Sequence, residues 1–341
     1  MKSNATGKDK PTPYLTNGGF QRQHEEDQFV PAKFGVSCGG DLWKADDIRA
    51  VEEFGYDSFW TGEHIVYHRP ILESITVLTY AAALTSRIRI GPATMILPLR
   101  HPTIIAKQIS SLDVLSNGRV TMTIGVGGDY PREFAACDVP MKERGRRATE
   151  IMEIMRKYWS GERFDYDGEI FKLEDVDMLP MPVQPGGPPI WVSGRQKAPM
   201  KRAALLGDGW HPYMYTPERC RDSFSQVKAM ANDAGRTLPD DYVFAIFIYV
   251  CIGDDAASAR EFAVGELKYR YDQEFDHLID KYAAYGPADR IIEMLAKFID
   301  AGVNYFILAP IMPPDNRRAH MERLASEVLP ELEKMEPGRI T

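Results

Sequence analysis

Two side chains capable of acid–base chemistry follow a strand-like segment, "YDSFWT" (56–61). Glu63 and His64 come two and three residues after this apolar run, where a buried strand would end. Histidine exchanges a proton near neutral pH, and a neighbouring carboxylate can orient the ring or stabilise its charged form. An isolated histidine is more often structural. The spacing alone therefore leaves His64 open between proton transfer and packing.

A second strand-like segment, "RIRIGPAT" (87–94), ends in residues that suit a strand poorly. Pro92 lacks the amide donor of a sheet ladder, and Gly91 has no side chain to pack. Small residues also end the segments "RVTMTIGVG" (119–127) and "PPIWVSG" (188–194). Small residues at several strand ends favour a flat, bulky ligand that lies against the backbone.

The turn "SGRQK" (193–197) combines small residues with cationic charge. Ser193, Gly194 and Arg195 lie between a predicted strand and a predicted helix, where free backbone N–H groups and the helix dipole favour an anion. A phosphate cradle and an ordinary turn with surface charge both fit these residues. His211, in the next short strand-like segment, is a further candidate for the wall of a ligand pocket.

These residues need a scaffold that brings the ends of many strands together, and the hydrophobic pattern predicts one. The predicted strands are 33–38, 56–61, 87–94, 119–127, 188–194, 207–212, 242–252 and 303–310. The predicted helices are 43–54, 75–84, 103–115, 144–159, 199–206, 217–234, 287–301 and 316–332. Eight alternating pairs predict an α/β fold, a (β/α)8 TIM barrel with insertions, whose site lies at the carboxyl ends of the strands.

A doubly wound open sheet is the alternative fold. It is disfavoured because "CGGDLW" (38–43), after the first predicted strand, lacks the glycine spacing of a dinucleotide-binding turn. We expect residues 1–30 to form a polar, flexible arm and residues 31–341 to form a single barrel domain. Two insertions interrupt the barrel, at 164–187 and 253–286. The second follows the seventh strand, so we expect it to carry a helix and to be a candidate lid.

Composition excludes several classes of function. The formal net charge of −8 over 341 residues argues against a nucleic-acid or anionic-membrane partner. The longest apolar run, 242–252, is too short to span a bilayer, and the polar N-terminus lacks the apolar core of a signal peptide. No histidines, cysteines or carboxylates have metal-ligand spacing. We therefore expect a cytoplasmic protein with reduced cysteines and no metal site.

Four stretches resemble the luciferase-like flavin-dependent oxidoreductases, the family of bacterial luciferase and deazaflavin-dependent relatives. They are "YDSFWTGEH", "RIRIGPATMILPLRHPTIIAKQISSLDVLSNGRVTMTIGVGG", "REFAACDVPMKERGRRATEIMEIMRKYW" and "PPIWVSGRQKAPMKRAALLGDGW". Together they span most of residues 33–212 in the family's order. The resemblance implies a (β/α)8 barrel that binds a reduced flavin or deazaflavin at its C-terminal face.

The resemblance also implies roles for individual residues. The bond between Ala93 and Thr94 matches a non-proline cis peptide that supports the cofactor ring in this family. His64 and Glu63 match the position of an acid–histidine pair in deazaflavin-using relatives, with Glu in place of the commoner Asp. The remaining expected contacts are Gly127, Asp129, Ser193, Gly194 and Arg195 for the cofactor, with Trp60 and His211 for the substrate. Trp60 also fits the barrel core, because it lies inside a strand.

Several activities are compatible with this resemblance. The first expectation is a monooxygenase that uses reduced FMN and molecular oxygen on a small organic substrate, with a flavin reductase as a possible partner. The alternative is a dehydrogenase or reductase that exchanges a hydride with the deazaflavin coenzyme F420. A barrel without cofactor or catalysis is the third, disfavoured because the small residues at the strand ends are intact. A homodimer is expected in each case.

Overall fold

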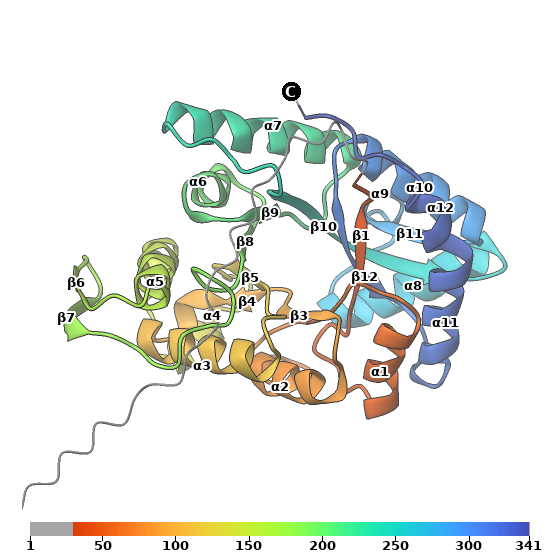
Figure 1. Ribbon diagram of the computed structural model, residues 1–341. Coiled ribbons are helices and arrows are strands. Elements are labelled where there is room, and N and C mark those ends of the chain that lie inside the picture. The colour runs from red at the N-terminus through yellow and green to blue at the C-terminus, as the bar shows by residue number, and fades with distance from the viewer. Residues whose placement is uncertain (1–29, 341) are drawn as a thin grey trace, which may run out of the picture. The chain divides into compact units, whose positions relative to one another are not determined.

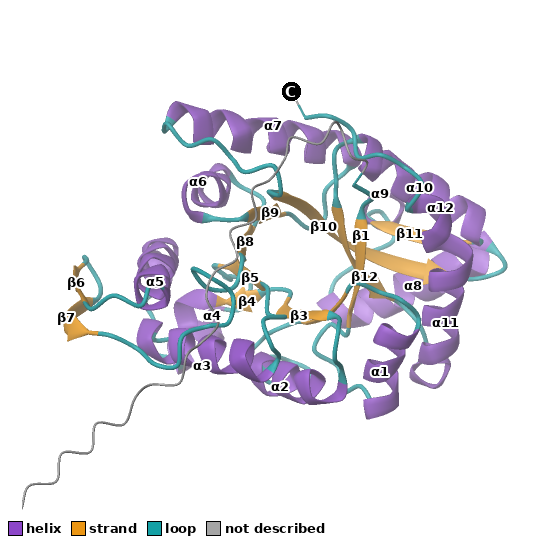
Figure 2. Cartoon of the chain, in the orientation of Figure 1, coloured by secondary structure: helices purple, strands orange, loops and turns teal. Residues whose placement is uncertain are grey.

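The structure, a computed structural model, describes residues 30–340, and its strands form a ring inside a layer of helices (Figure 1, Figure 2). The predicted arm lies outside these residues, except for Val30. The barrel strands are β1 (Lys33–Ser37), β2 (Ser58–Thr61), β3 (Arg89–Pro92), β4 (Met95–Ile96), β5 (Met122–Gly125), β8 (Ile190–Ser193), β9 (Gly209–His211), β10 (Val243–Ile252) and β12 (Tyr305–Pro310). They are parallel and follow the order β3-β2-β1-β12-β10-β9-β8-β5-β4.

Strands β3 and β4 together occupy the third position of the barrel. β3 pairs with β2, β4 pairs with β5, and a cis peptide between Ala93 and Thr94 separates them. A bridge between Ile90 and Val120 also joins β3 to the segment that leads into β5. Counted in this way, the barrel has eight strand positions, which confirms the predicted (β/α)8 fold.

The helices that alternate with these strands also follow the prediction closely. They are α1 (Ala45–Glu53), α2 (Ser74–Leu84), α3 (Pro102–Leu115), α5 (Arg144–Trp159), α6 (Lys197–Leu206), α7 (Pro217–Asp233), α10 (Ala288–Asp300) and α11 (Arg317–Arg323). The predicted last helix is divided, because a π-helical turn (Leu324–Val328) and α12 (Leu329–Leu332) follow α11. Pro330 cannot donate to the regular helical ladder at this point.

Both insertions carry secondary structure. The first forms an antiparallel pair, β6 (Phe164–Asp167) and β7 (Lys172–Val176). The second contains the expected helix, α8 (Ala256–Tyr271), but also α9 (Ile279–Tyr282) and a strand that the sequence analysis missed, β11 (Ala283–Gly286). β11 pairs with the last residues of β10. A further short helix, α4 (Pro131–Ala136), follows β5 and was also not predicted.

Aromatic side chains fill the interior of the barrel. Trp60, fully buried, lies 5.3 Å from Trp191 and 6.1 Å from Tyr305 between ring centroids. Its Nε1 donates to Ser58 Oγ at 2.6 Å. A Cβ on Gly91 would lie 2.5 Å from the Trp60 ring, so the glycine in β3 makes room for this indole.

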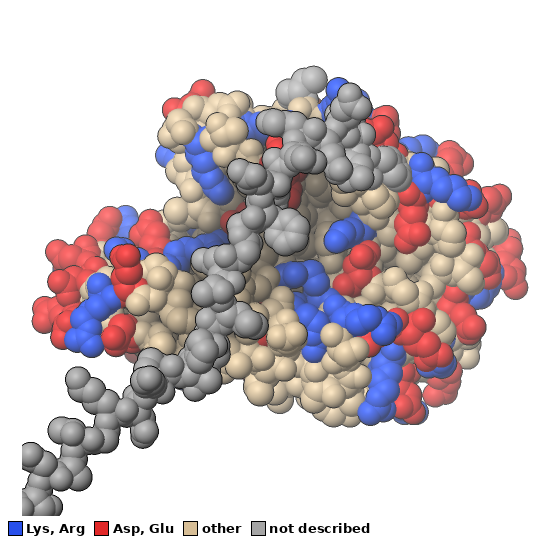
Figure 3. Space-filling model, viewed as in Figure 1, with Lys and Arg blue, Asp and Glu red and all other residues tan. Residues whose placement is uncertain are grey.

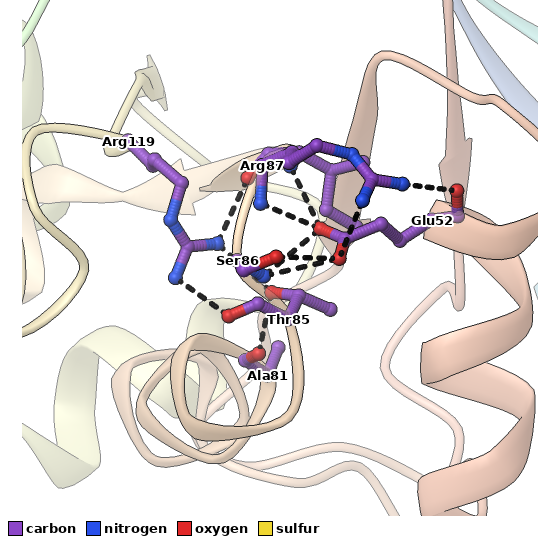
Figure 4. A network of polar contacts seen from close by, with 7 residues as sticks. Glu52, Ala81, Thr85, Ser86, Arg87 and Arg119 are labelled. Carbon is purple, nitrogen blue, oxygen red and sulfur yellow. Dashed lines mark hydrogen bonds and ion pairs between the residues drawn. The ribbon is translucent and has the colours of Figure 1, made fainter.

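A polar network joins the helices to the strands at the amino ends of the barrel (Figure 4). Arg119 donates five hydrogen bonds, to oxygens of Ala82, Thr85, Ile88 and Ser116. Nearby, the Glu52 carboxylate accepts from the backbone N–H groups of Ser86, Arg87 and Ile88. Gly118 precedes Arg119 with a φ of +78°, the left-handed conformation expected where a helix ends in glycine.

No helix within residues 30–340 is both long and apolar enough to cross a membrane. The same residues contain no group of three or more histidine, cysteine, aspartate or glutamate side chains placed to hold a metal ion.

Candidate active site

A cavity of about 730 Å³ opens at the carboxyl ends of the barrel strands. Residues from the ends of β2, β4, β5, β8 and β9 line it, together with residues of β10 and α8. Its wall carries two carboxylates, Glu63 and Asp129, against six cations: Arg69, Lys142, Arg144, Arg195, Arg202 and Arg270. Figure 3 shows Lys and Arg side chains gathered around the hollow near the centre of the view. A chain of net negative charge therefore presents a cationic cavity, which favours anionic ligands.

His64 lies on the cavity wall and is held by a carboxylate that the sequence analysis did not identify. Its Nδ1 is 2.7 Å from Oε1 of Glu133, on α4, and the other oxygen of Glu133 accepts the backbone N–H of Ile65 at 2.7 Å. Glu133 is buried, and the imidazole stacks on Tyr67 with 4.0 Å between ring centroids. Hydrogen bonding at Nδ1 fixes the ring and leaves Nε2 for a ligand.

Glu63 is a neighbour of His64 in sequence but is not its hydrogen-bond partner. Its buried carboxylate accepts from Ser74 Oγ at 2.7 Å and from the backbone N–H of Ile96 at 2.6 Å, and it pairs with Arg100. These contacts tie β2 to α2 and β4. The expected Glu63–His64 pair is therefore corrected: Glu133 takes the place of Glu63 beside the histidine, and Glu63 stabilises the cavity wall.

The backbone between β3 and β4 has the conformation that the family resemblance implied. The Ala93–Thr94 peptide is cis, and both residues line the cavity. Thr123 Oγ1 donates to the carbonyl of Pro92 at 2.7 Å and lies 3.3 Å from Thr94 Oγ1. On the neighbouring strand β5, a Cβ added to Gly125 would lie 2.9 Å from Thr94 Cγ2. The backbone is thus held in place and left open toward the cavity.

The other expected cofactor contacts also line this cavity. Gly127, with a φ of +59°, and Asp129 follow β5. Ser193 is the last residue of β8, and Gly194 and Arg195 follow it. The guanidinium of Arg195 lies 4.9 Å from the centroid of the Tyr213 ring. Gly194 and Arg195 lie in the turn between β8 and α6, so the predicted cradle has the strand–turn–helix context that an anion site requires.

Three further cations extend this cradle. Arg144 and Lys142 come from the start of α5 and the turn before it, and Arg202 comes from α6. Arg202 donates to Thr149 Oγ1 at 3.0 Å and to the Gly145 carbonyl at 2.7 Å, so α5 and α6 hold it jointly. We call Lys142, Arg144, Arg195 and Arg202 the cradle cations.

The two residues expected to contact substrate have different positions. His211 lines the cavity at the end of β9 and is 1% exposed, and neither ring nitrogen has a hydrogen-bond partner within residues 30–340. Burial lowers the pKa of His211 to about 3, so the ring is neutral at physiological pH. Trp60, by contrast, points into the barrel interior, and in the described part of the chain it does not line the cavity. Its expected substrate contact is corrected to a core role.

Comparison with known proteins identifies the family. Residues 45–305 match the family model described as luciferase-like monooxygenase. An uncharacterized protein of Mycobacterium tuberculosis is 33% identical over 171 residues, and the chain spans 58% of its length. The F420-dependent hydroxymycolic acid dehydrogenase of Mycobacterium tuberculosis is 27% identical over 331 residues, covering 87% of this chain and 88% of that protein.

A solved structure shows the same fold. The F420-dependent secondary alcohol dehydrogenase in complex with an F420–acetone adduct superimposes with a TM-score of 0.78 at 19% identity, covering 89% of this chain and 99% of that one. The family match extends over most of the described residues and includes the cis peptide, the cradle and His64. The chain belongs to the luciferase-like monooxygenase family.

Proposed function

We propose that this protein is an oxidoreductase that binds coenzyme F420 in the barrel cavity and exchanges a hydride with a small organic substrate. The observation that carries the proposal is His64, held on the cavity wall by the buried carboxylate of Glu133. Hydride transfer to a carbonyl carbon, or from an alcohol carbon, needs a group that gives a proton to the attached oxygen or takes one from it, and a fixed imidazole supplies such a group. A relative whose match covers 87% of this chain is named as an F420-dependent dehydrogenase, and this name supports the same cofactor for the present protein.

The residues present fit a flat cofactor with an anionic tail. Ala93, Thr94 and Gly125 would support the ring. A larger side chain at Gly125 would meet Thr94, so the glycine keeps this part of the cavity wall open. The cradle cations, with Ser193 and Gly194, would hold the phosphate and acidic groups of the tail. A bound deazaflavin supplies the hydride donor or acceptor.

The chain's own contribution to the reaction is orientation and proton transfer. Glu133 accepts a hydrogen bond at His64 Nδ1, so Nε2 is the nitrogen that exchanges a proton with substrate. Because Glu133 also accepts the N–H of Ile65, its position does not depend on the substrate. His211 is neutral and buried, and it offers one ring nitrogen as donor and the other as acceptor for orienting the substrate.

The second candidate is the activity that the sequence analysis first expected, a monooxygenase that uses reduced FMN and oxygen. A flavin reductase would supply the reduced FMN. The description of the matching family favours it. Both cofactors present a flat ring and a phosphate, so the same cradle serves either. The flavin reductase partner, a homodimer and a cytoplasmic location stay predictions.

Titration of the purified protein separates the two candidates. We expect F420 to bind more tightly than FMN, and reduced F420 to be oxidised by a carbonyl substrate under nitrogen. An oxygenated product formed from reduced FMN, oxygen and the substrate, together with weaker binding of F420, would support the monooxygenase instead.

A further inference from the structure

The cavity has a second cationic region besides the cradle. It consists of Arg69, in the loop after β2, and Arg270, near the end of α8 in the insertion that follows β10. We call these two residues the arginine pair. In the order of the barrel, β2 and β10 are separated by β1 and β12, whereas the cradle follows β5 and β8. The arginine pair and the cradle therefore lie over different sectors of the barrel rim.

Contacts with a single carboxylate hold the arginine pair together. Nη2 of Arg69 is 3.3 Å from Oδ1 of Asp41, and Nη2 of Arg270 is 3.8 Å from Oδ2 of the same residue. Arg270 also packs against backbone, because a Cβ on Gly39 would lie 3.1 Å from its Nη1. The hydroxyl of Tyr67 donates to the carbonyl of Arg270 at 3.0 Å, which connects the β2 loop to α8.

This cluster carries one positive charge more than Asp41 neutralises. The side chains of Arg69 and Arg270 are 9% and 15% exposed, and both line the cavity. The Nε–H of each is buried without an acceptor in the described part of the chain. A buried cation with an unmade hydrogen bond is costly, and an anion that contacts both guanidinium groups would offset that cost.

Aromatic side chains beside the arginine pair provide the apolar part of the site. The guanidinium carbon of Arg270 lies 5.7 Å from the centroid of the Tyr249 ring, and Tyr249 also shares a hydroxyl–hydroxyl hydrogen bond with Tyr271. Tyr67 stacks on His64, so the aromatic wall continues from the arginine pair to the proposed proton donor. An organic molecule bound along this wall would have its reacting carbon beside His64 and its charged end beside the arginine pair.

We propose that the arginine pair recognises an anionic group, a carboxylate or a phosphate, at the end of the substrate remote from the reacting carbon. The proposal rests on the oxidoreductase function above and narrows its substrate class to organic anions. Arginine suits this role because its planar guanidinium forms paired hydrogen bonds with such groups. The same chemistry in the cofactor tail is the competing source of an anion, and the test separates the two.

The test measures binding of small probes by calorimetry to the full chain without cofactor. Benzoate and phenyl phosphate carry the anion, and benzamide is the neutral match for benzoate. We expect the unmodified protein to prefer benzoate over benzamide, and Arg69→Gln and Arg270→Gln each to weaken benzoate binding about 10- to 100-fold while leaving benzamide unchanged. Arg270→Lys retains the charge and should recover part of the affinity. Melting temperatures identify variants that fail to fold.

A second titration assigns the anion to substrate or cofactor. FMN is compared with riboflavin, which lacks the phosphate, in the same variants and in Arg195→Gln. We expect Arg195→Gln to reduce the preference for FMN and the two variants of the arginine pair to keep it.

Benzoate binding that is unchanged in both variants of the arginine pair, or no preference for benzoate over benzamide in the unmodified protein, would overturn the proposal. Loss of the FMN preference in the arginine-pair variants would overturn it as well, by assigning the pair to the cofactor. Failure of F420 binding would refute the proposed function alone, because the benzoate titrations contain no cofactor.

Discussion

The two ends of the barrel differ in how completely their polar groups are paired. At the amino ends, Arg119 makes five hydrogen bonds and Glu52 accepts three backbone N–H groups. Figure 4 shows part of this network. At the carboxyl ends, several buried polar atoms on the cavity wall lack partners within residues 30–340. They are Nε of Arg69, Arg144 and Arg270 and both ring nitrogens of His211. The paired end stabilises the fold, and the unpaired end is shaped for ligands.

The difference has an energetic basis. A buried polar group without a partner costs about 1–3 kcal/mol, so several on one cavity wall lower the stability of the free protein. A ligand that supplies the missing acceptors regains this free energy on binding. Unpaired groups concentrated in the cavity therefore indicate sites of recognition.

The largest effect that this comparison predicts is on catalysis. His64→Asn should slow turnover by about 10²- to 10⁴-fold, since asparagine keeps a hydrogen bond to Glu133 but cannot exchange a proton. Cofactor affinity and melting temperature should change little, and single-turnover kinetics on the same preparation separates these quantities. Glu133→Gln should lower the rate less. A His64→Asn variant with full rate would remove the proton-transfer role.

At the opposite end, Arg119→Ala should act on stability. The change leaves buried carbonyls of Ala82 and Ile88 without a donor, so we expect a loss of about 2–4 kcal/mol in the free energy of unfolding. Chemical denaturation measures the loss, and the affinity of the folded protein for cofactor should be unchanged. Arg87→Ala, on a side chain that is 74% exposed, is the matched control. Equal stability of both variants would contradict the assigned role of the network.

Within the cradle, the effect should be on affinity. Arg195→Ala should weaken cofactor binding by about 1.5–3 kcal/mol, the size of a hydrogen bond to a charged group. Because Arg195 is exposed and packs beside the Tyr213 ring, the melting temperature of the free protein should fall little. Titration of the cofactor, monitored by absorbance, tests this. An unchanged dissociation constant would exclude Arg195 from the cradle.

The last predictions are two separate dependences of stability on pH. Burial disfavours the charged form of Glu52, but hydrogen bonds from the N–H groups of Arg87, Ser86 and Ile88 prevail and lower its pKa from 4.5 to about 2. The stability that Glu52 contributes is therefore present above pH 4.5 and is lost as the pH falls toward 2. Burial lowers the pKa of His211 from 6.5 to about 3. Below pH 6.5 the unfolded chain binds a proton that the folded chain does not, so stability falls between pH 6.5 and 3.

Substitutions assign each pH range to one end of the barrel. Glu52→Gln should flatten the denaturation profile between pH 4.5 and 2, and His211→Asn should flatten it between pH 6.5 and 3. Chemical denaturation at several pH values gives both slopes. A steep slope above pH 4.5 that persists in His211→Asn would mean that another group causes it.

Much of the fold could be predicted from the sequence, because strand and helix periods depend on neighbouring residues. The eight strand–helix pairs and the position of the Ala93–Thr94 bond agree with expectation. The strand β11 was missed because its four residues, "AAYG", show no alternating pattern. Within the site, Ser193, Gly194 and Arg195 were predicted together because they follow one another at a strand end, and all three line the cavity.

The sequence by itself determined which residues reach the carboxyl ends of the strands, since each follows its own strand by a few positions. Only the tertiary structure decided which of them meet. His64 pairs with Glu133, 69 residues away, rather than with adjacent Glu63, and Arg69 and Arg270 share Asp41. Side chains at successive positions near a strand end point in different directions, so adjacency does not imply contact. Closure of the barrel and the paths of α4 and α8 bring distant residues to the same wall, and a local sequence pattern does not encode either.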